Sequence, residues 1–118
     1  MDIEILKQKL RTFAKERNWE QFHSPKNLVM ALNGEAGELT EIFQWLSEAD
    51  SVKEKLSAKN MELAEEELAD ILLYLIRIAD KLDIDLEKAA NKKIRKNEDK
   101  YPVELSKNNA IKYNRRNE

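Results

Sequence analysis

The chain has 118 residues, and its 21 Lys and Arg nearly balance 23 Asp and Glu, for a formal net charge of −2. This mixed charge provides no basic field that would recruit a nucleic-acid polymer. The absence of Cys excludes disulfides and thiolate zinc sites, and one His cannot build a histidine-based metal site. The length is that of a single domain.

Only two Gly and two Pro, with 37% charged residues, favour a mostly helical fold. No run of about 18 apolar residues is present, so no membrane span is expected. The N-terminal residues lack the basic and apolar regions of a secretory signal. These features together predict a cytoplasmic protein.

Apolar residues at helical spacing predict a first helix that begins after Asp2 and ends near Arg17. Its apolar positions are Ile3, Leu6, Leu10 and Phe13. Residues 18–24 then form an aromatic-rich loop.

A second helix is predicted from Pro25 to Glu48, with Ser24 as its N-cap. Its apolar stripe consists of Leu28, Leu32, Leu39, Ile42 and Leu46. Glu35 falls in register with that stripe, and an unpaired buried carboxylate is costly. Gly34 and Gly37 each cost about 1 kcal/mol relative to Ala, which indicates a close approach to the backbone by a ligand or by another helix.

The third helix is capped by Ser57 and runs to about Leu82, after a connector with a helical turn near residues 52–56. Its middle is apolar nearly all round, at Ile71, Leu72, Leu73, Leu75 and Ile76. A short chain has few helices to cover such a girdle, so we expect a homo-oligomer.

A charged fourth helix is predicted from Asp83 or Asp85 to about Lys100, where Tyr101 and Pro102 end it. The fold class is therefore all-α, with four helices in one domain over residues 1–102. Residues 103–118 form a polar tail that we expect to be mobile alone or to order on a ligand.

Two acid pairs interrupt the apolar helices, Glu35 with Glu38 and Glu67 with Asp70. Residues three apart on a helix are neighbours, so each pair sets two like charges side by side. Carboxylates that face one another beside a core need a cation, and Mg²⁺ prefers such oxygen ligands. The alternative is a solvated helix face, which fits Glu66 well and Glu35 poorly.

These acids and their surroundings resemble the MazG-like, all-α nucleoside triphosphate pyrophosphohydrolases, most closely the dCTP pyrophosphatase branch. The similarity extends from about residue 5 to residue 113. It is carried by Arg17–His23, Gly34–Leu39, Phe43–Trp45, Glu66–Asp70, Tyr74–Leu75 and Tyr101–Pro102.

The resemblance implies a four-helix unit completed by oligomerisation, as a dimer of dimers. It implies Mg²⁺-dependent hydrolysis of dCTP and related pyrimidine deoxynucleotides between the α- and β-phosphates. The products are the monophosphate and pyrophosphate. The implied Mg²⁺ ligands, and the catalytic set, are Glu35, Glu38, Glu67 and Asp70.

The resemblance also implies substrate-binding residues. Trp19, His23 and Trp45 would line the base pocket, with Trp45 two turns beyond Glu38 on the same face of the helix. Phosphate contacts would come from Lys93 and Asn97, with hydroxyl donors from Tyr74 and Tyr101. From the residues alone, an aromatic side chain is as compatible with a core, and Lys93 with an ordinary solvated lysine.

Other functions are compatible with the same sequence. One is a broad or non-canonical nucleotide pyrophosphohydrolase, and another is a non-enzymatic helical interaction module, against which the full set of four acids speaks. A ferritin-like carboxylate bundle would need Glu-x-x-His pairs, and no His follows either acid pair.

Overall fold

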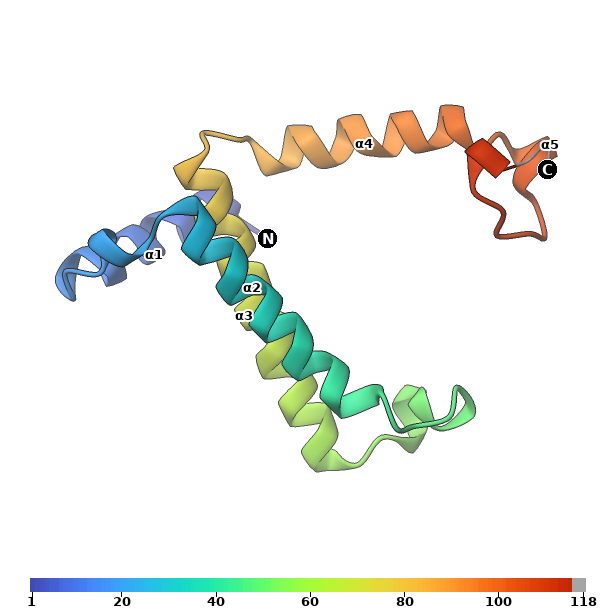
Figure 1. Cartoon of the computed structure of the whole chain (residues 1–118), viewed down its shortest axis with the longest axis horizontal. Coiled ribbons are helices and arrows are strands. Elements are labelled where there is room, and N and C mark those ends of the chain that lie inside the picture. Colours follow the sequence, from blue (N-terminus) through green and yellow to red (C-terminus); the bar gives the residue numbers. More distant parts are fainter. Residues whose placement is uncertain (116–118) are drawn as a thin grey trace. The chain divides into compact units, whose positions relative to one another are not determined.

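The computed structural model describes residues 1–115, which are helical with no strand among them (Figure 1). The α-helices are α1 (Ile3–Glu16), α2 (Pro25–Phe43), α3 (Ala58–Lys81), α4 (Leu86–Lys100) and α5 (Val103–Ser106). Short 3₁₀ turns are η1 (Glu20–Phe22), η2 (Ala49–Ser51), η3 (Lys53–Lys55) and η4 (Tyr113–Arg115). The predicted all-α class is confirmed.

The chain divides into two compact units, Met1–Ile84 and Asp85–Glu118. The first contains α1, α2 and α3, and the second contains α4 and α5. The predicted single domain over residues 1–102 stays a prediction. Of the predicted polar tail, residues 103–115 form α5 and η4 with the segment between them, and residues 116–118 lie outside the described part of the chain.

Side-chain caps start the long helices where the sequence predicts them. Asp2 accepts a hydrogen bond from the Ile5 amide at 3.1 Å, and Ser57 accepts one from the Asn60 amide at 3.0 Å. Ser24 and Asp85 cap α2 and α4 in the same way. Each cap satisfies an amide that has no partner within its helix, which fixes the start of the helix.

Two non-glycine residues in left-handed backbone conformation end α1 and α3. Asn18 and Asp83 both have φ of 55°. The amide that follows Asn18 bonds back to Ala14 O at 2.8 Å, and the amide that follows Asp83 bonds back to Ala79 O at 2.8 Å. This pattern is a Schellman motif, and it turns the chain sharply at the start of the loop over residues 18–24.

The second helix is shorter than predicted. The sequence predicts an end at Glu48, but α2 ends at Phe43. Beyond that end, the Ser47 hydroxyl accepts a hydrogen bond from the Asp50 amide at 3.1 Å, which holds the turn that leads into η2. A serine that offers the backbone this alternative bond competes with helix propagation.

Within the first unit, α2 and α3 lie side by side and antiparallel, and α1 packs against α3 (Figure 1). The buried apolar side chains are Ala14, Leu28, Ala64, Ile76 and Ala79. Of the predicted girdle, Ile76 is buried by the chain itself and residues 71–73 are half-buried. Within residues 1–115, no helix has the length and apolar character needed to cross a bilayer.

An apolar stripe on α3 remains exposed in the first unit. It consists of Leu68 and Leu75 on the helix and Leu82 at its C-cap, which are 57%, 41% and 50% exposed. These residues recur every seventh position, so they lie on one side of the helix. The exposed part of α3 is therefore a narrower stripe than the girdle that the sequence predicts.

Candidate functional site

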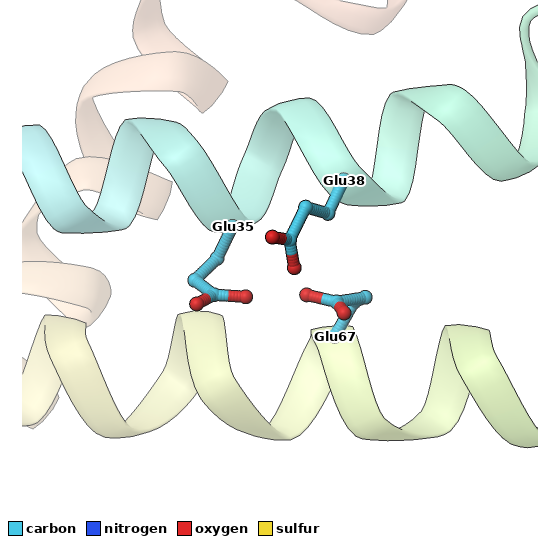
Figure 2. A group of neighbouring side chains, drawn as sticks. All are labelled: Glu35, Glu38 and Glu67. Atoms are coloured by element: carbon cyan, nitrogen blue, oxygen red, sulfur yellow. The ribbon is translucent and has the colours of Figure 1, made fainter.

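Three carboxylates from two helices face one another between α2 and α3 (Figure 2). Glu35 and Glu38 come from α2 and Glu67 from α3, and one oxygen of each lies within 4.8 Å of the others. This cluster forms because Glu35 lies in register with the apolar stripe that packs against α3. The sequence prediction that Glu35 points toward a core position is confirmed.

The cluster contains polar atoms that the protein does not satisfy. Glu35 Oε2 and Glu67 Oε2 are buried, and neither has a hydrogen-bond partner. A buried carboxylate oxygen without a partner is costly, and each such atom calls for an explanation. Three converging carboxylates are the donor set that a hard divalent cation prefers, so these residues form a fitting divalent-metal site.

The carboxylates hold a proton when no metal is bound. The pKa of Glu67 is raised from 4.5 to about 8, first because its protonated form hydrogen-bonds to Glu35. Loss of contact with water and the hydrogen bond and charge of Glu38 act in the same direction. The protein without metal therefore reduces its like-charge repulsion by keeping one carboxyl neutral near pH 7.

Asp70, the fourth predicted ligand, does not belong to this close group. It lies on α3 one turn beyond Glu67, its side chain is exposed, and it lines the adjacent pocket together with Glu35. Its role as a ligand stays a prediction.

A pocket of about 460 Å³ adjoins the carboxylates within the first unit. This volume is in the usual range for small-molecule sites. Its apolar walls are made of Leu6, Leu10, Phe13, Trp19, Leu28 and Leu73. Its polar walls are made of Lys9, His23, Glu35, Asp70, Tyr74 and Arg77. Glu35 belongs both to the pocket and to the acid cluster, so the two features form one site.

The aromatic residues of the loop meet α1 at this pocket. The Trp19 ring lies 5.6 Å from the Phe13 ring and 6.4 Å from the His23 ring, both edge-on. Such edge contacts hold an aromatic wall in a defined orientation. The structure therefore places Trp19 and His23 together, as the sequence predicts.

Trp45 does not line this pocket and is 88% exposed. The sequence argument that Trp45 continues the face of Glu38 is wrong, because α2 ends at Phe43. Beyond that point the backbone turns and helical register no longer applies.

Tyr74 lines the pocket on α3. Burial raises the pKa of its hydroxyl, and the charges of Glu35 and Asp70 raise it further. The hydroxyl therefore stays protonated at neutral pH and can donate a hydrogen bond to a ligand.

The other three predicted contact residues, Lys93, Asn97 and Tyr101, belong to the second unit. Lys93 and Asn97 are exposed on α4. The pKa of the Lys93 ammonium is lowered, first by the positive charge of Lys100.

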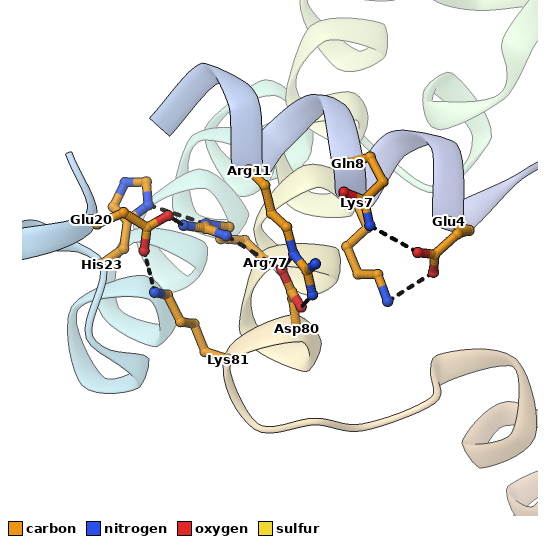
Figure 3. Close-up of polar contacts among 9 residues, drawn as sticks. All are labelled: Glu4, Lys7, Gln8, Arg11, Glu20, His23, Arg77, Asp80 and Lys81. Atoms are coloured by element: carbon orange, nitrogen blue, oxygen red, sulfur yellow. Dashed lines mark hydrogen bonds and ion pairs between the residues drawn. The ribbon is translucent and has the colours of Figure 1, made fainter. Parts of the chain in front are cut away.

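The sequence reasoning missed Arg77. This residue is only 4% exposed and lines the pocket from α3. It lies at the centre of a chain of ion pairs that joins α1, the loop and α3 (Figure 3). The members of this chain are Arg11, Asp80, Arg77, Glu20 and Lys81. A usable signal was present, since Arg77 follows Asp70 by two helical turns and is the one cation between Asp70 and Lys81.

Gly34 and Gly37 are not explained by packing within the described part of the chain. A Cβ built on either glycine would meet nothing within 4 Å. Of the two explanations that the sequence offered, packing of another helix of the described chain is therefore wrong.

The pKa of Glu67 leads to a prediction on stability without metal. The pKa of Glu67 is about 8 in the folded protein and 4.5 for an ordinary carboxyl, so the folded state favours the protonated form. Below pH 4.5 this carboxyl is protonated in both the folded and the unfolded chain, and its contribution to the stability of the fold is complete. This contribution is lost as the pH rises toward 8. In EDTA, Glu67→Gln should therefore gain melting temperature relative to the unmodified chain between these pH values, whereas Glu66→Gln should not. If the melting temperatures of both variants depended on pH in the same way, Glu67 would not be the carboxyl that holds a proton in the cluster.

Comparisons with known proteins identify the family of this chain. Residues 30–115 match the MazG-like family. The chain is 46% identical to dCTP pyrophosphatase 1 of Rattus norvegicus and 42% identical to that of Homo sapiens, over 86% of its length in both cases. It spans 59% of the length of these two relatives.

A solved structure is also similar, that of a pyrophosphatase from Archaeoglobus fulgidus. The TM-score is 0.77 at 41% identity, over 84% of this chain and 91% of the other. The all-helical fold, the carboxylates between α2 and α3 and these matches lead to one conclusion. The chain belongs to the MazG-like family.

Proposed function

We propose that this protein is a Mg²⁺-dependent nucleoside triphosphate pyrophosphohydrolase that acts on dCTP and related pyrimidine deoxynucleotides. The products are the monophosphate and pyrophosphate. The observation that carries this proposal is the carboxylate cluster with two unpartnered buried oxygens, which adjoins an aromatic pocket. The names of the relatives, dCTP pyrophosphatase 1, support the choice of substrate.

The carboxylates supply the metal site and the proton acceptor. Glu35, Glu38, Glu67 and Asp70 hold the cation, which when bound neutralises triphosphate charge and makes water more acidic. A glutamate of this set, rather than Asp70, accepts the proton of the attacking water. The new bond joins the water oxygen to the α-phosphorus. The bond from that phosphorus to its bridging oxygen breaks, and pyrophosphate leaves.

The pocket beside the acids selects and orients the nucleotide. Trp19 and His23 bind the base, and stacking on an aromatic ring is worth about 1–3 kcal/mol per base. Tyr74, which also lines the pocket, donates a hydrogen bond from its hydroxyl to the nucleotide.

The proposed phosphate contacts are Lys93 and Asn97, with a hydroxyl donor at Tyr101. Lys93 and Asn97 lie one turn apart on α4, and Tyr101 follows at its end. Lys93 carries an exposed positive charge on α4, which supports this role. This protein has no glycine-rich phosphate loop in its sequence, so side chains and metal must meet the phosphate charge.

Analysis of products tests the proposed reaction. With Mg²⁺, dCTP should give dCMP and pyrophosphate, and EDTA should stop the reaction. A panel of canonical and modified nucleotides separates the dCTP preference from a broad or non-canonical specificity. Formation of dCDP and orthophosphate would contradict cleavage between the α- and β-phosphates. A lack of turnover on the whole panel would favour a non-enzymatic interaction module.

The active form that we propose is a homo-oligomer, a dimer of dimers. The exposed apolar stripe of Leu68, Leu75 and Leu82 on α3 supports an interface, because such stripes mark contact surfaces. Trp45, at 88% exposure, is available to complete the pocket of a neighbouring subunit. Closed symmetric assemblies are the usual form of homo-oligomers.

Light scattering at micromolar concentration tests the assembly. We expect a mass near four times 13.8 kDa. Leu68→Glu and Leu75→Glu should lower the mass, because each places a charge in the apolar stripe, whereas Glu66→Gln should not. A fully active species at the monomer mass would refute the interface, and an active dimer would refute only the tetramer.

We propose a cytoplasmic enzyme that removes unwanted deoxynucleotides from the nucleotide pool. Its proposed partners are the nucleotide and further copies of the chain, with neither a nucleic-acid polymer nor a membrane among them.

A further inference from the structure

Arg77 is a buried cation whose guanidinium nitrogens are all directed at other protein groups (Figure 3). Nη2 donates to Glu20, Nη1 donates to Asp80 at 3.4 Å, and Nε donates to His23 Nδ1 at 3.2 Å. Its side chain is 5% exposed. Arg77 therefore lines the pocket while its hydrogen bonds go to the protein, so it acts through the groups that it holds.

The contact with His23 fixes where the imidazole carries its proton. A guanidinium can only donate hydrogen bonds and is not deprotonated in proteins. The ring nitrogen that faces it must therefore be the unprotonated acceptor, which is Nδ1. A neutral imidazole with an unprotonated Nδ1 carries its proton on Nε2. Nε2 is then the ring nitrogen that remains for a ligand in the pocket, and it can only donate.

We propose that Arg77 is a positioning residue for substrate recognition, which holds His23 neutral as an Nε2–H donor toward a hydrogen-bond acceptor on the base. In a pyrimidine such as cytosine, the acceptors are the ring nitrogen N3 and the carbonyl O2. This inference rests on the proposed function, since it assigns the base to the pocket of Trp19 and His23.

The charges around His23 favour this state. Burial lowers the pKa of the imidazole first, and the positive charge of Arg77 lowers it further. The negative charge of Glu20 acts in the opposite direction, and Lys81 adds a smaller lowering effect. The net result is a neutral ring at neutral pH. Without Arg77, the negative charge of Glu20 would remain to favour protonation of the imidazole.

The ion pairs provide a way to remove Arg77 without leaving a bare carboxylate. Asp80 also pairs with Arg11, whose Nε and Nη2 donate to it at 2.7 and 2.5 Å. Glu20 also pairs with Lys81. Each carboxylate therefore keeps one cation in an Arg77→Met variant, and we expect the variant to fold.

The first measurement is nitrogen NMR of the uniformly ¹⁵N-labelled protein without nucleotide. The chain contains one His, so the ring signals belong to His23. We expect the Nε2–H tautomer and a pKa below the ordinary value in the unmodified protein. In Arg77→Met the pKa should rise and protonation of Nδ1 should appear. Lys81→Met is the matched control, because it also removes a cation from Glu20 but has no hydrogen bond with His23.

The second measurement is the kinetics with dCTP and Mg²⁺ at a pH above the His23 pKa. Arg77→Met should raise KM roughly tenfold with a smaller change in kcat, as for the loss of one oriented hydrogen bond. Lys81→Met should leave KM unchanged. If Arg77→Met changes the protonation of the His23 ring but leaves KM unchanged, the role of Arg77 in substrate recognition is overturned.

The two proposals fail in different ways. An unmodified protein with the proton on Nδ1, or an Arg77→Met variant with an unchanged ring, overturns the inference on Arg77 even if dCTP is hydrolysed. If the imidazole shows the expected protonation states but no nucleotide is hydrolysed, the proposed function and the role of Arg77 in recognition are both refuted. Only the effect of Arg77 on the tautomer of His23 would then remain.

Discussion

Glu38→Gln and Glu67→Gln should each lower the rate of pyrophosphate release from dCTP by roughly 10²–10³-fold, the loss seen when one stabilising group is removed from a preorganised site. Each change replaces the carboxylate of a proposed metal ligand by a neutral amide in the cluster between α2 and α3. The helices should persist, because the change also removes like-charge repulsion from the metal-free protein.

Neighbouring acids provide the controls for this experiment. Glu41→Gln on α2 and Glu66→Gln on α3 remove the same charge from exposed positions outside the cluster. Turnover, circular dichroism and thermal melts should be measured on all four variants. Near-normal turnover in Glu38→Gln and Glu67→Gln would exclude these residues as ligands, and equal losses in the controls would point to a general charge effect.

Trp19→Ala should weaken binding of the nucleotide by roughly 5–150-fold, which corresponds to the loss of about 1–3 kcal/mol of stacking on the base. The Trp19 side chain is 43% exposed and forms part of the pocket wall next to Phe13 and His23. Because the ring is not fully buried, its removal should lower affinity more than stability. The measurement is the dissociation constant of a non-hydrolysable dCTP analogue.

Phe22→Ala is the matched control for Trp19→Ala. Phe22 lies in the same loop and is 58% exposed, and it does not line the pocket. Its removal should leave the affinity unchanged. Equal effects of both substitutions would mean that the loop acts through its fold and not through stacking, and unchanged affinity in Trp19→Ala would place the base elsewhere.

The sequence predicts those parts of the fold that depend on interactions between residues close together in the chain. Capping by Asp2 and Ser57 needs only hydrogen bonds to amides three residues away, so the helix starts are readable from the chain. The inward position of Glu35 follows from helical spacing alone. Both predictions use interactions within one helix, which do not depend on the rest of the fold.

The missed features depend on contacts between distant segments or on a local competition. Arg77 pairs with Glu20, 57 residues earlier, which no helical pattern reveals. The predicted helical face of Trp45 was wrong because α2 ends at Phe43, and the Ser47 hydrogen bond that holds the following turn is a weak signal in the sequence. The burial of Ile76 and the partial burial of residues 71–73 on α3 likewise depend on how the helices of the first unit pack.

The arrangement of the first unit separates two tasks along the chain. The three clustered carboxylates lie on the α2–α3 pair, whereas Trp19, His23 and most of the apolar pocket wall come from residues 1–28. These segments meet through Arg77, Asp80 and Lys81 on the last turns of α3. Under the proposed function, substitutions in α1 and its loop should therefore alter the choice of base while the clustered carboxylates keep their places. A new nucleotide specificity would thus be sought by varying the N-terminal segment on a constant helical hairpin.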